Sequence, residues 1–274
     1  MGERRSLGFY LLATFFGLYV LFLYGPTITI AVLSFQGPNG GLTFPLNGVS
    51  FHWFGNLFER QLVGDFAGSL KRSLCLALLV TLATVTISVA AGLAYRKRFA
   101  GDTVLFYLAI ASLVVPSILV SLGIGLLFDL LGIDPDWYSS AFGAQLTWTL
   151  PFGLLIMFAV FSRFNPSYEE AARDLGATPW QTLRHVVLPI VAPSILGVAL
   201  FGFTLSYDEF ARTLLTAGAE NTLPLEIYGM TTNITTPVLF ALGTLTTAFS
   251  FIVIGTCLIG VVALQRRRSR RGGG

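Results

Sequence analysis

Two acidic residues at the end of a long apolar run are the first candidates for chemistry in this sequence. Asp208 and Glu209 follow Tyr207 in the segment FTLSYDEF, after an apolar stretch that begins near Ile190. Carboxylates attract cations, and an aromatic ring beside them can add a cation–π contact. Because an ionisable side chain facing lipid is costly, the pair is expected to face the protein interior or an aqueous vestibule. An alternative of equal weight is that both carboxylates bond Arg212 or cap the helix end.

The other side chains that often perform catalysis are scattered along the chain. His52 and His185 are far apart in sequence, and Cys75 and Cys257 lie inside apolar runs without the spacing of metal ligands. The sequence also contains no G-x-x-x-x-G-K-[ST] phosphate-binding loop. We therefore expect no catalytic residue, no metal site and no cofactor held by this chain.

A second group of charged residues lies in NPSYEEAARDLGATPWQTLRHVVLPIVAP, the most polar stretch between two apolar runs. The capping residues, prolines and glycine in this stretch predict two short helices with a bend between them. Asn165 or Ser167 can cap the first helix, with Glu170 placed to complete a Ser-x-x-Glu capping box. Gly176 permits a left-handed end to that helix.

The second helix of this stretch has its own boundary signals. Thr178 is expected to cap it, Pro179 to start it and Gln181 to complete a Thr-x-x-Gln capping box, while Pro189 is expected to limit it. A compact helix with a small-residue face and flanking charges suits a groove on another protein. The alternative is a solvated connector.

Composition places these groups in a membrane protein. Of 274 residues, 54% are hydrophobic and 11% are charged, against roughly 25% charged in an ordinary soluble domain. A helix needs about 20 mostly apolar residues to cross a bilayer. An all-α integral membrane domain is therefore expected over residues 1–271, with a disordered tail at 272–274. The predicted spans are residues 8–33, 73–95, 104–127, 141–161, 190–205 and 238–264.

The distribution of basic residues predicts the orientation. Four of the 17 Lys and Arg residues, Arg60, Lys71, Arg72 and Arg212, fall on one side of six spans, and the others fall on the opposite side. An excess of Lys and Arg marks the cytoplasmic side, so both termini and the stretch 162–189 are expected in the cytoplasm. The net charge of +3 therefore reflects topology, and nucleic-acid binding is rejected.

Three loops are expected on the external side. The segment 36–70 is rich in Gly, Pro and Asn and predicts a short interfacial helix, with Trp53, Phe54 and Phe58 either anchored at the headgroups or packed on the bundle. Residues 134–136 form a second turn and residues 217–237 a third.

The polar stretch resembles the EAA signature of the permease subunits of binding-protein-dependent ABC importers. Glu170-Ala171-Ala172 is followed after three residues by Gly176, and after nine more by Val186, one residue and Leu188-Pro189. The one visible departure is Val186, where the family usually has isoleucine, and it keeps a β-branched apolar side chain.

The resemblance implies a type I importer bundle of six transmembrane helices in which the loop 162–189 seats in a cleft of the ATP-binding subunit. The expected coupling residues are Glu169, Glu170, Ala171, Ala172, Asp174, Gly176, Leu188 and Pro189. It further implies a bacterial inner-membrane location, with ATP and Mg on a dimer of partner ATPase subunits. A second permease subunit and an external solute-binding protein complete the implied partners.

Two more stretches narrow the resemblance. FTLSYDEF and LPLEIYGM, with SFQGPNG after the first span, are similar to the spermidine/putrescine permeases of the PotC type. That similarity implies a polyamine or a related small cation as solute, Tyr207, Asp208 and Glu209 as candidate pathway residues, and a PotB-like second permease. Permeases for iron(III), thiamine, sulfate or phosphonate are the alternatives within the family. A secondary transporter or ion channel is the rival class, although spans two to four contain essentially no acidic or histidine residue in their interiors.

Overall fold

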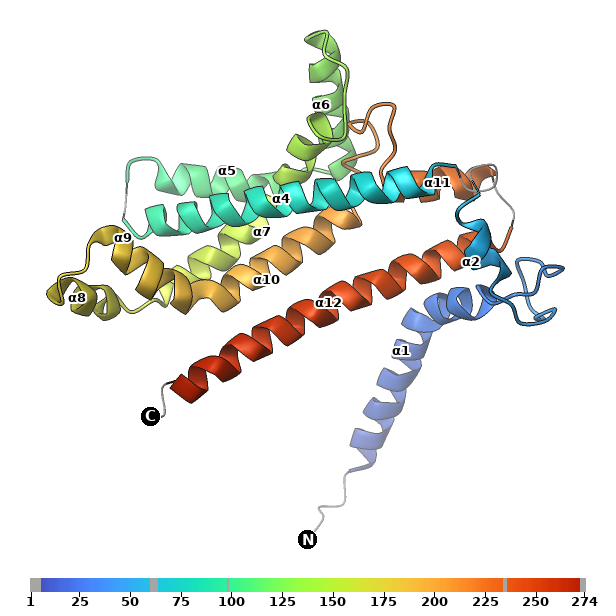
Figure 1. The fold of residues 1–274 in the computed structure, drawn as a ribbon, viewed down its shortest axis with the longest axis horizontal. Helices are drawn as coiled ribbons and strands as arrows, with labels where there is room; N and C mark the ends of the chain where they lie inside the picture. The colour runs from blue at the N-terminus through green and yellow to red at the C-terminus, as the bar shows by residue number, and fades with distance from the viewer. Residues whose placement is uncertain (1–5, 60–63, 98, 234–235, 272–274) are drawn as a thin grey trace. The chain divides into compact units, whose positions relative to one another are not determined.

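The computed structural model of the protein describes residues 6–59, 64–97, 99–233 and 236–271 (Figure 1). Within these ranges the regular elements are helices, apart from one isolated bridge between Gln36 and Val49. The all-α expectation is therefore confirmed. Residue contacts divide the chain into one unit of residues 1–66 and 227–251 and another of residues 67–226 and 252–274.

Long apolar helices dominate the described chain, as the composition predicts. Five are long and apolar enough to cross a membrane, and one bent pair gives a sixth. Each overlaps one predicted span. The five are α1 (Leu7–Leu33), α4 (Phe66–Tyr95), α7 (Ser140–Ser162), the continuous run Pro179–Tyr207 and α12 (Val238–Arg271), of which Val238–Gly260 meets the criterion. The predicted tail at 272–274 lies outside the described residues.

The third predicted span differs from the structure because it is broken. Helix α5 (Asp102–Val114) ends two residues before Pro116, and the axis of α6 (Ser117–Leu130) is bent by 105° from that of α5. Proline has no amide hydrogen to donate and disfavours helical torsions in the residue before it. Val115 accordingly takes an extended conformation, with φ −70° and ψ 127°. The apolar run 104–127 is thus two helices rather than one straight rod.

The first unit contains α1 and a loop folded around one buried glutamine. The Gln36 side chain is fully buried, donates to the carbonyls of Gly41, Thr43 and Pro45, and accepts from the Asn47 amide at 2.7 Å. These bonds satisfy the loop's backbone groups without regular structure. The predicted short helix is present as α2 (His52–Asn56).

The aromatic residues of that loop divide by exposure. Trp53 is buried, which favours packing over anchoring, whereas Phe58 is exposed. The third predicted loop also differs from the structure, because residues 223–233 of it form α11 (Leu223–Asn233). The Ser73 hydroxyl accepts from the Leu223 amide at the first position of that helix at 2.8 Å, which satisfies one donor that a helix start leaves unpaired.

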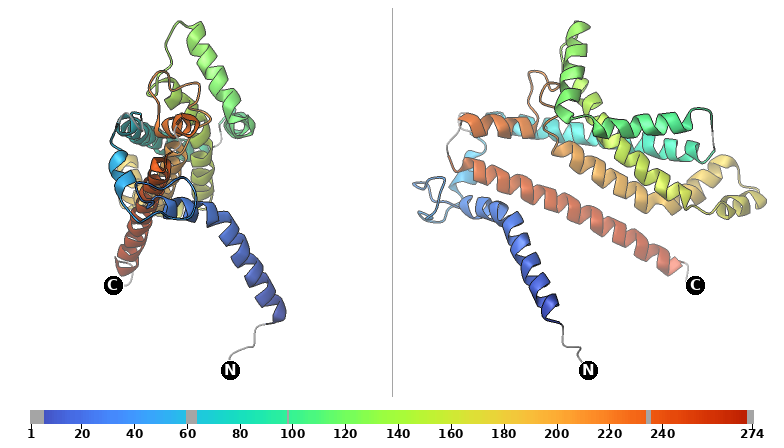
Figure 2. Two further views of the ribbon diagram at one scale, coloured as in Figure 1. Left: turned by 90° about the vertical axis from the view of Figure 1, so that its right-hand side faces the viewer. Right: turned by 180° about the vertical axis from the view of Figure 1, so that it is seen from behind.

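The second unit is a bundle in which α4, α5, α7 and α10 (Leu188–Tyr207) run side by side (Figures 1 and 2). Glycine permits close approach of α4 and α7, since a Cβ on Gly153 would lie 2.3 Å from the Ser88 hydroxyl oxygen. An apolar cluster joins the C-terminal parts of α4 and α7 to the N-terminal part of α10. Its buried members are Met157, Phe161, Val187, Val191 and Val198.

Helix α10 does not begin independently at Pro189. The chain runs from α9 (Pro179–Thr182) through a π-helical turn, η1 (Leu183–Val187), directly into α10. The prediction that Pro189 limits the preceding helix is therefore wrong. A π turn moves the hydrogen-bond register by one residue, and the proline lies just beyond that turn, within the first two positions of α10.

Candidate functional site

The predicted helix pair lies at one end of the bundle, beyond the ends of α4 and α7 (Figure 1). The first helix is α8 (Ser167–Asp174), and the Asn165 carboxamide accepts from the Ser167 amide at 3.0 Å just before it. The N-cap position is held by Pro166, which has no side-chain cap, so Asn165 bonds the chain one residue before the cap, Ser167 is the first helical residue, and the Ser167–Glu170 box does not form. Gly176 ends the helix with φ +85°, in the left-handed region that the sequence predicts.

The second helix is capped as predicted. The Thr178 hydroxyl accepts from the Gln181 amide at 3.3 Å, and the Gln181 side chain accepts from the Thr178 amide at 2.8 Å. Because Gly176 and Thr178 lie two residues apart, the bend between the helices is short and is fixed at both sides. Local sequence thus determines the shape of this segment.

The bent segment presents apolar side chains away from the bundle. Leu175 is 90% exposed and Trp180 is 65% exposed, and Tyr168 is also exposed. An exposed apolar patch rimmed by charge is typical of a protein interaction site. Of the predicted coupling residues, those that are exposed include Glu170, Ala171, Asp174, Gly176 and Pro189, whereas Ala172, Glu169 and Leu188 are half-buried.

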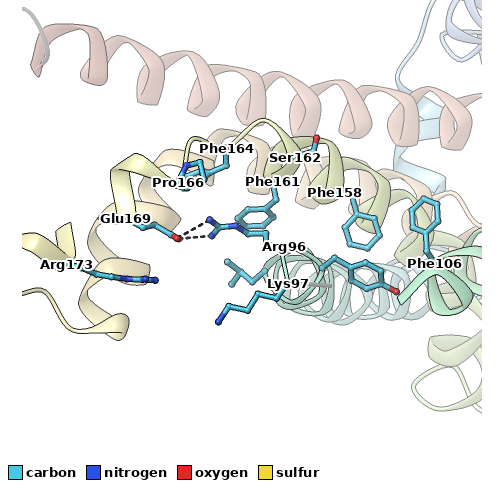
Figure 3. Close-up of a pocket in the computed structure, with 13 residues that line it drawn as sticks. Arg96, Lys97, Phe106, Phe158, Phe161, Ser162, Phe164, Pro166, Glu169 and Arg173 are labelled. Atoms are coloured by element: carbon cyan, nitrogen blue, oxygen red, sulfur yellow. Dashed lines mark hydrogen bonds and ion pairs between the residues drawn. The ribbon is translucent and has the colours of Figure 1, made fainter. Parts of the chain in front are cut away.

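Glu169 turns inward and joins α8 to the end of α4. Its carboxylate makes a bidentate pair with the Arg96 guanidinium, at 2.6 Å and 3.0 Å (Figure 3). The same guanidinium lies over the rings of Phe164, at 4.9 Å, and Phe161, at 5.7 Å. The hydrogen bonds from Arg96 hold the pKa of the Glu169 carboxyl below its usual value. Planar fork geometry with ring stacking is a property of arginine that lysine lacks.

The acidic pair lies at the opposite end of α10, about 30 Å along a straight 20-residue helix. Tyr207 is buried with its ring stacked on Phe203, 5.9 Å between centroids, so a solute cannot reach it in this conformation. Asp208 is exposed. The Glu209 carboxylate accepts from the backbone amide of Arg212 at 2.8 Å and so caps the turn that follows the helix.

Arg212 is a fully buried cation at this end of the bundle. Its guanidinium donates to the Thr147 hydroxyl and to the Ser112 carbonyl, and lies 5.0 Å from the Trp148 ring centroid. A polar chain lies next to it. The buried Gln145 carboxamide donates to Thr213 at 3.1 Å and accepts from the Ser206 hydroxyl. The segment after α10 is therefore tied to α5 and α7.

A known protein family matches most of the chain, including both of these ends of the bundle. Residues 83–271 match the family described as the binding-protein-dependent transport system inner membrane component. The chain belongs to that family. As an inner membrane component of a transport system it is a multi-pass membrane protein, in agreement with its apolar helices.

Individual relatives of the family resemble the chain over nearly its full length. The spermidine/putrescine transport system permease protein PotC of Shigella flexneri is 29% identical over 92% of this chain and 93% of its own. The putrescine transport system permease protein PotI of Escherichia coli is 29% identical over 92% of each. The expected resemblance to permeases of the PotC type is therefore confirmed.

Solved structures share the fold. A bacterial ABC transporter that imports the acidic polysaccharide alginate contains a chain with a TM-score of 0.65 and 18% identity, covering 98% of this chain and 99% of that one. A structure of the alginate transporter in complex with a pentasaccharide-bound periplasmic protein gives a TM-score of 0.66 at 16% identity, covering 95% and 94%. The fold is therefore that of an ABC importer membrane subunit.

Sequence reasoning missed Arg96 and Trp180 as parts of these sites, and it named Arg212 only as a possible partner of the acidic pair and not as a buried residue. Arg96 was read as one of many basic residues on one side, and its partner lies 73 residues away. Trp180 follows a helix-starting proline, where an aromatic residue carries no particular signal. Arg212 follows the acidic pair, and a charged residue in a loop is ordinarily solvated.

Proposed function

We propose that this chain is a channel-forming subunit of an ATP-driven importer for polyamines or a related small organic cation in a bacterial inner membrane. The observation that carries the proposal is the near-full-length similarity to permeases named for spermidine and putrescine. The family alone supports a transport component, and the two relatives supply the solute class.

The bent segment of α8 and α9 is the proposed seat of the ATP-binding subunit. Its support is the exposed set of Leu175, Trp180 and Tyr168 next to the EAA residues. Motion imposed on α8 has a direct route into the bundle, because Glu169 is bonded to Arg96 at the end of α4. Val187 and Val191, in the apolar cluster, give a second route into α10.

The remaining partners are proposed from the family resemblance. ATP and Mg belong to a dimer of ATP-binding subunits, and a second permease of PotB-like type completes the pathway. A solute-binding protein docks at the end that carries Asp208 and Glu209, which makes that end external and both termini cytoplasmic. The neighbouring alginate importer in complex with a periplasmic protein supports this kind of assembly.

Asp208 is the group best placed to meet a cationic solute, because it is exposed while Tyr207 is buried and Glu209 holds the turn. The experiment is uptake of labelled spermidine by vesicles that contain the reconstituted importer, with ATP inside. Asp208→Asn is expected to lower uptake about tenfold with assembly intact, and Asp134→Asn, in another exposed turn, serves as the matched control.

The outcomes separate the alternatives. Uptake of iron(III), thiamine, sulfate or phosphonate in place of spermidine would contradict the proposed solute class but agree with the proposal that the protein is an importer subunit. Uptake by the chain without any ATPase would replace the importer by a secondary transporter or channel. Unchanged spermidine uptake by Asp208→Asn would remove Asp208 from the pathway.

A further inference from the structure

A cavity of about 830 Å³ lies at the bundle end that carries α8, and the coupling role does not account for it. It is bounded by the ends of α4 and α7, by the first turns of α5 and by α8 (Figure 3). Its two ends differ in chemistry. One wall consists of aromatic rings and the opposite rim carries charged groups.

The apolar wall is formed by Tyr95, Phe106 and Phe158. The Phe158 ring lies 4.4 Å from Tyr95 and 5.4 Å from Phe106, measured between centroids. All three residues belong to helices that are long or apolar enough to lie in a bilayer. This part of the cavity is therefore suited to a hydrocarbon chain and not to a hydrated solute.

The rim has an excess of positive charge. Arg96, Lys97 and Arg173 line the cavity together with one carboxylate, Glu169, which is already paired with Arg96. Within the described ranges, no carboxylate lies within ion-pair distance of the Lys97 ammonium or the Arg173 guanidinium, and the carboxylate that both attract at longer range, Glu169, is already bonded to Arg96. Two cations remain for a ligand, which favours a phosphate and excludes a polyamine at this place.

We propose that this cavity binds an anionic glycerophospholipid, with its phosphate at Lys97 and Arg173 and an acyl chain along Phe106 and Phe158. This class combines a phosphate with hydrocarbon chains, and anionic lipids are concentrated at the cytoplasmic membrane surface. The proposal rests on the proposed function for one point, the cytoplasmic placement of this end of the bundle.

One consequence concerns the elements that the lipid would join. Lys97 follows the end of α4 and Arg173 lies on α8, so a shared phosphate would bridge the two elements that the Arg96–Glu169 pair already connects. Bound lipid would then stiffen the same link.

The test measures lipid retained by the full chain, purified in detergent with its co-purifying partners and without nucleotide. Native mass spectrometry counts bound dioleoyl phosphatidylglycerol against dioleoyl phosphatidylcholine, which has the same tails. Lys97→Gln with Arg173→Gln is expected to weaken phosphatidylglycerol binding about tenfold or more. Arg163→Gln with Arg184→Gln removes the same charge from exposed residues outside the cavity and is expected to change it less than twofold.

A second arm separates a lipid from a free anion. Phe106→Ala is expected to weaken retention of phosphatidylglycerol, and soluble glycerol phosphate is expected to compete poorly. Effective competition by glycerol phosphate, with no effect of Phe106→Ala, would make this an anion site and overturn the lipid proposal. Equal losses in both charge variants, or no preference for phosphatidylglycerol, would also overturn it.

Failure of the proposed function would be recognised separately. Lipid retention needs neither ATP nor transport, so a chain that failed to import spermidine could still retain the lipid. Conversely, an active importer without selective retention would contradict only the lipid site.

Discussion

The Arg96 guanidinium is held on one side by a carboxylate and on its faces by two aromatic rings. Each contact uses a feature that only arginine has, namely a planar fork of donors and a flat face. The pair is largely enclosed, with side-chain exposures of 20% for Arg96 and 16% for Glu169. It is therefore worth more than a solvated surface pair of the same charges.

A double-mutant cycle measures this pair. Glu169→Gln, Arg96→Met and the double variant are expected to show a coupling energy of about 1 kcal/mol in unfolding of the purified chain. Glu170→Gln, at an exposed carboxylate on the same helix, is the control and is expected to change the unfolding free energy by less than about 0.5 kcal/mol. A coupling energy near zero would leave α8 without this link to α4.

The same pair predicts a pH dependence with a definite sign. Because the folded-state pKa of Glu169 is lowered by Arg96, its contribution is fully present above the unfolded value of about 4.3 and is lost as pH falls through the lower folded value. The stability difference between the native chain and Glu169→Gln should be constant from about pH 7 to pH 5 and shrink below about pH 4.3. A difference that shrinks near neutral pH would contradict the assignment.

The buried Arg212 gives a second residue-scale prediction. Arg212→Lys is expected to lower the unfolding free energy by about 3 kcal/mol, because a lysine cannot reproduce the contacts with Thr147, Ser112 and the Trp148 ring and leaves a buried charge poorly compensated. Arg184→Lys, at an exposed site, is the control. Thermal unfolding in detergent measures both, and equal stability of the two variants would show that the guanidinium shape is not needed.

Sequence reasoning predicts local partners better than distant ones. The Thr178–Gln181 box is visible in sequence because its members lie three residues apart and the bond pattern repeats across proteins. The pairing of Arg96 with Glu169 depends on how α4 and α8 meet, which no local pattern encodes. The burial of Arg212 likewise depends on the polar groups that α5 and α7 supply.

The helices themselves show where sequence patterns succeed and fail. The apolar runs predict α1 and α7 closely, and the end of α4 but not its start at Phe66, because the length of an apolar run nearly determines a membrane helix while polar residues can extend it. The bend before Pro116 was missed, since a proline inside an apolar run is often tolerated in membrane helices. The π turn before α10 was missed because it depends on register and not on composition.

The bend between α8 and α9 is the element on which coupling is proposed to depend. Gly176→Ala places a side chain at φ +85° and is expected to cost about 1 kcal/mol locally. Spermidine-dependent uptake per ATP hydrolysed should fall, because the exposed Leu175 and Trp180 would change their relative position.

Gly132 supplies a matched control for that variant. It also has a positive φ, +66°, and a Cβ there would likewise meet no atom within 4 Å. Gly132→Ala should therefore introduce similar strain at the end of α6 without changing the ratio of uptake to hydrolysis. If both variants lowered that ratio equally, general destabilisation and not the α8–α9 bend would explain the effect.

At the scale of the whole molecule, the exposed apolar surface of the long helices requires an environment other than water. The α1 window is entirely unburied within the described chain, and Phe15 and Phe22 are among its exposed side chains. Such helices need lipid or a second permease beside them. Composition predicts that these helices must be covered. Which of them contact lipid and which contact a second permease depends on how the subunits assemble.

Orientation is a whole-molecule property that labelling can test. In a chain with Cys75→Ser and Cys257→Ser, a membrane-impermeant thiol reagent added to intact cells is expected to label Asp134→Cys and not Ser167→Cys. In inverted vesicles the result should be reversed. Labelling of Ser167→Cys from outside would place α8 on the external face and remove the proposed seat of the ATPase.

The wide turn at Leu183–Val187 also limits which insertions and deletions this chain can accept. An α-helix advances about 100° per residue. A π turn accommodates one extra residue within an α-helix, so deleting one residue inside it would restore regular winding and leave the positions beyond it on nearly the same face. Deleting one residue just outside the turn would instead rotate every position beyond it by about that angle relative to the capped helix before it. Val191 and Val198 would then leave their neighbours, and the acidic end would face another direction. The spacing between the EAA segment and the following span therefore sets the rotational phase of α10.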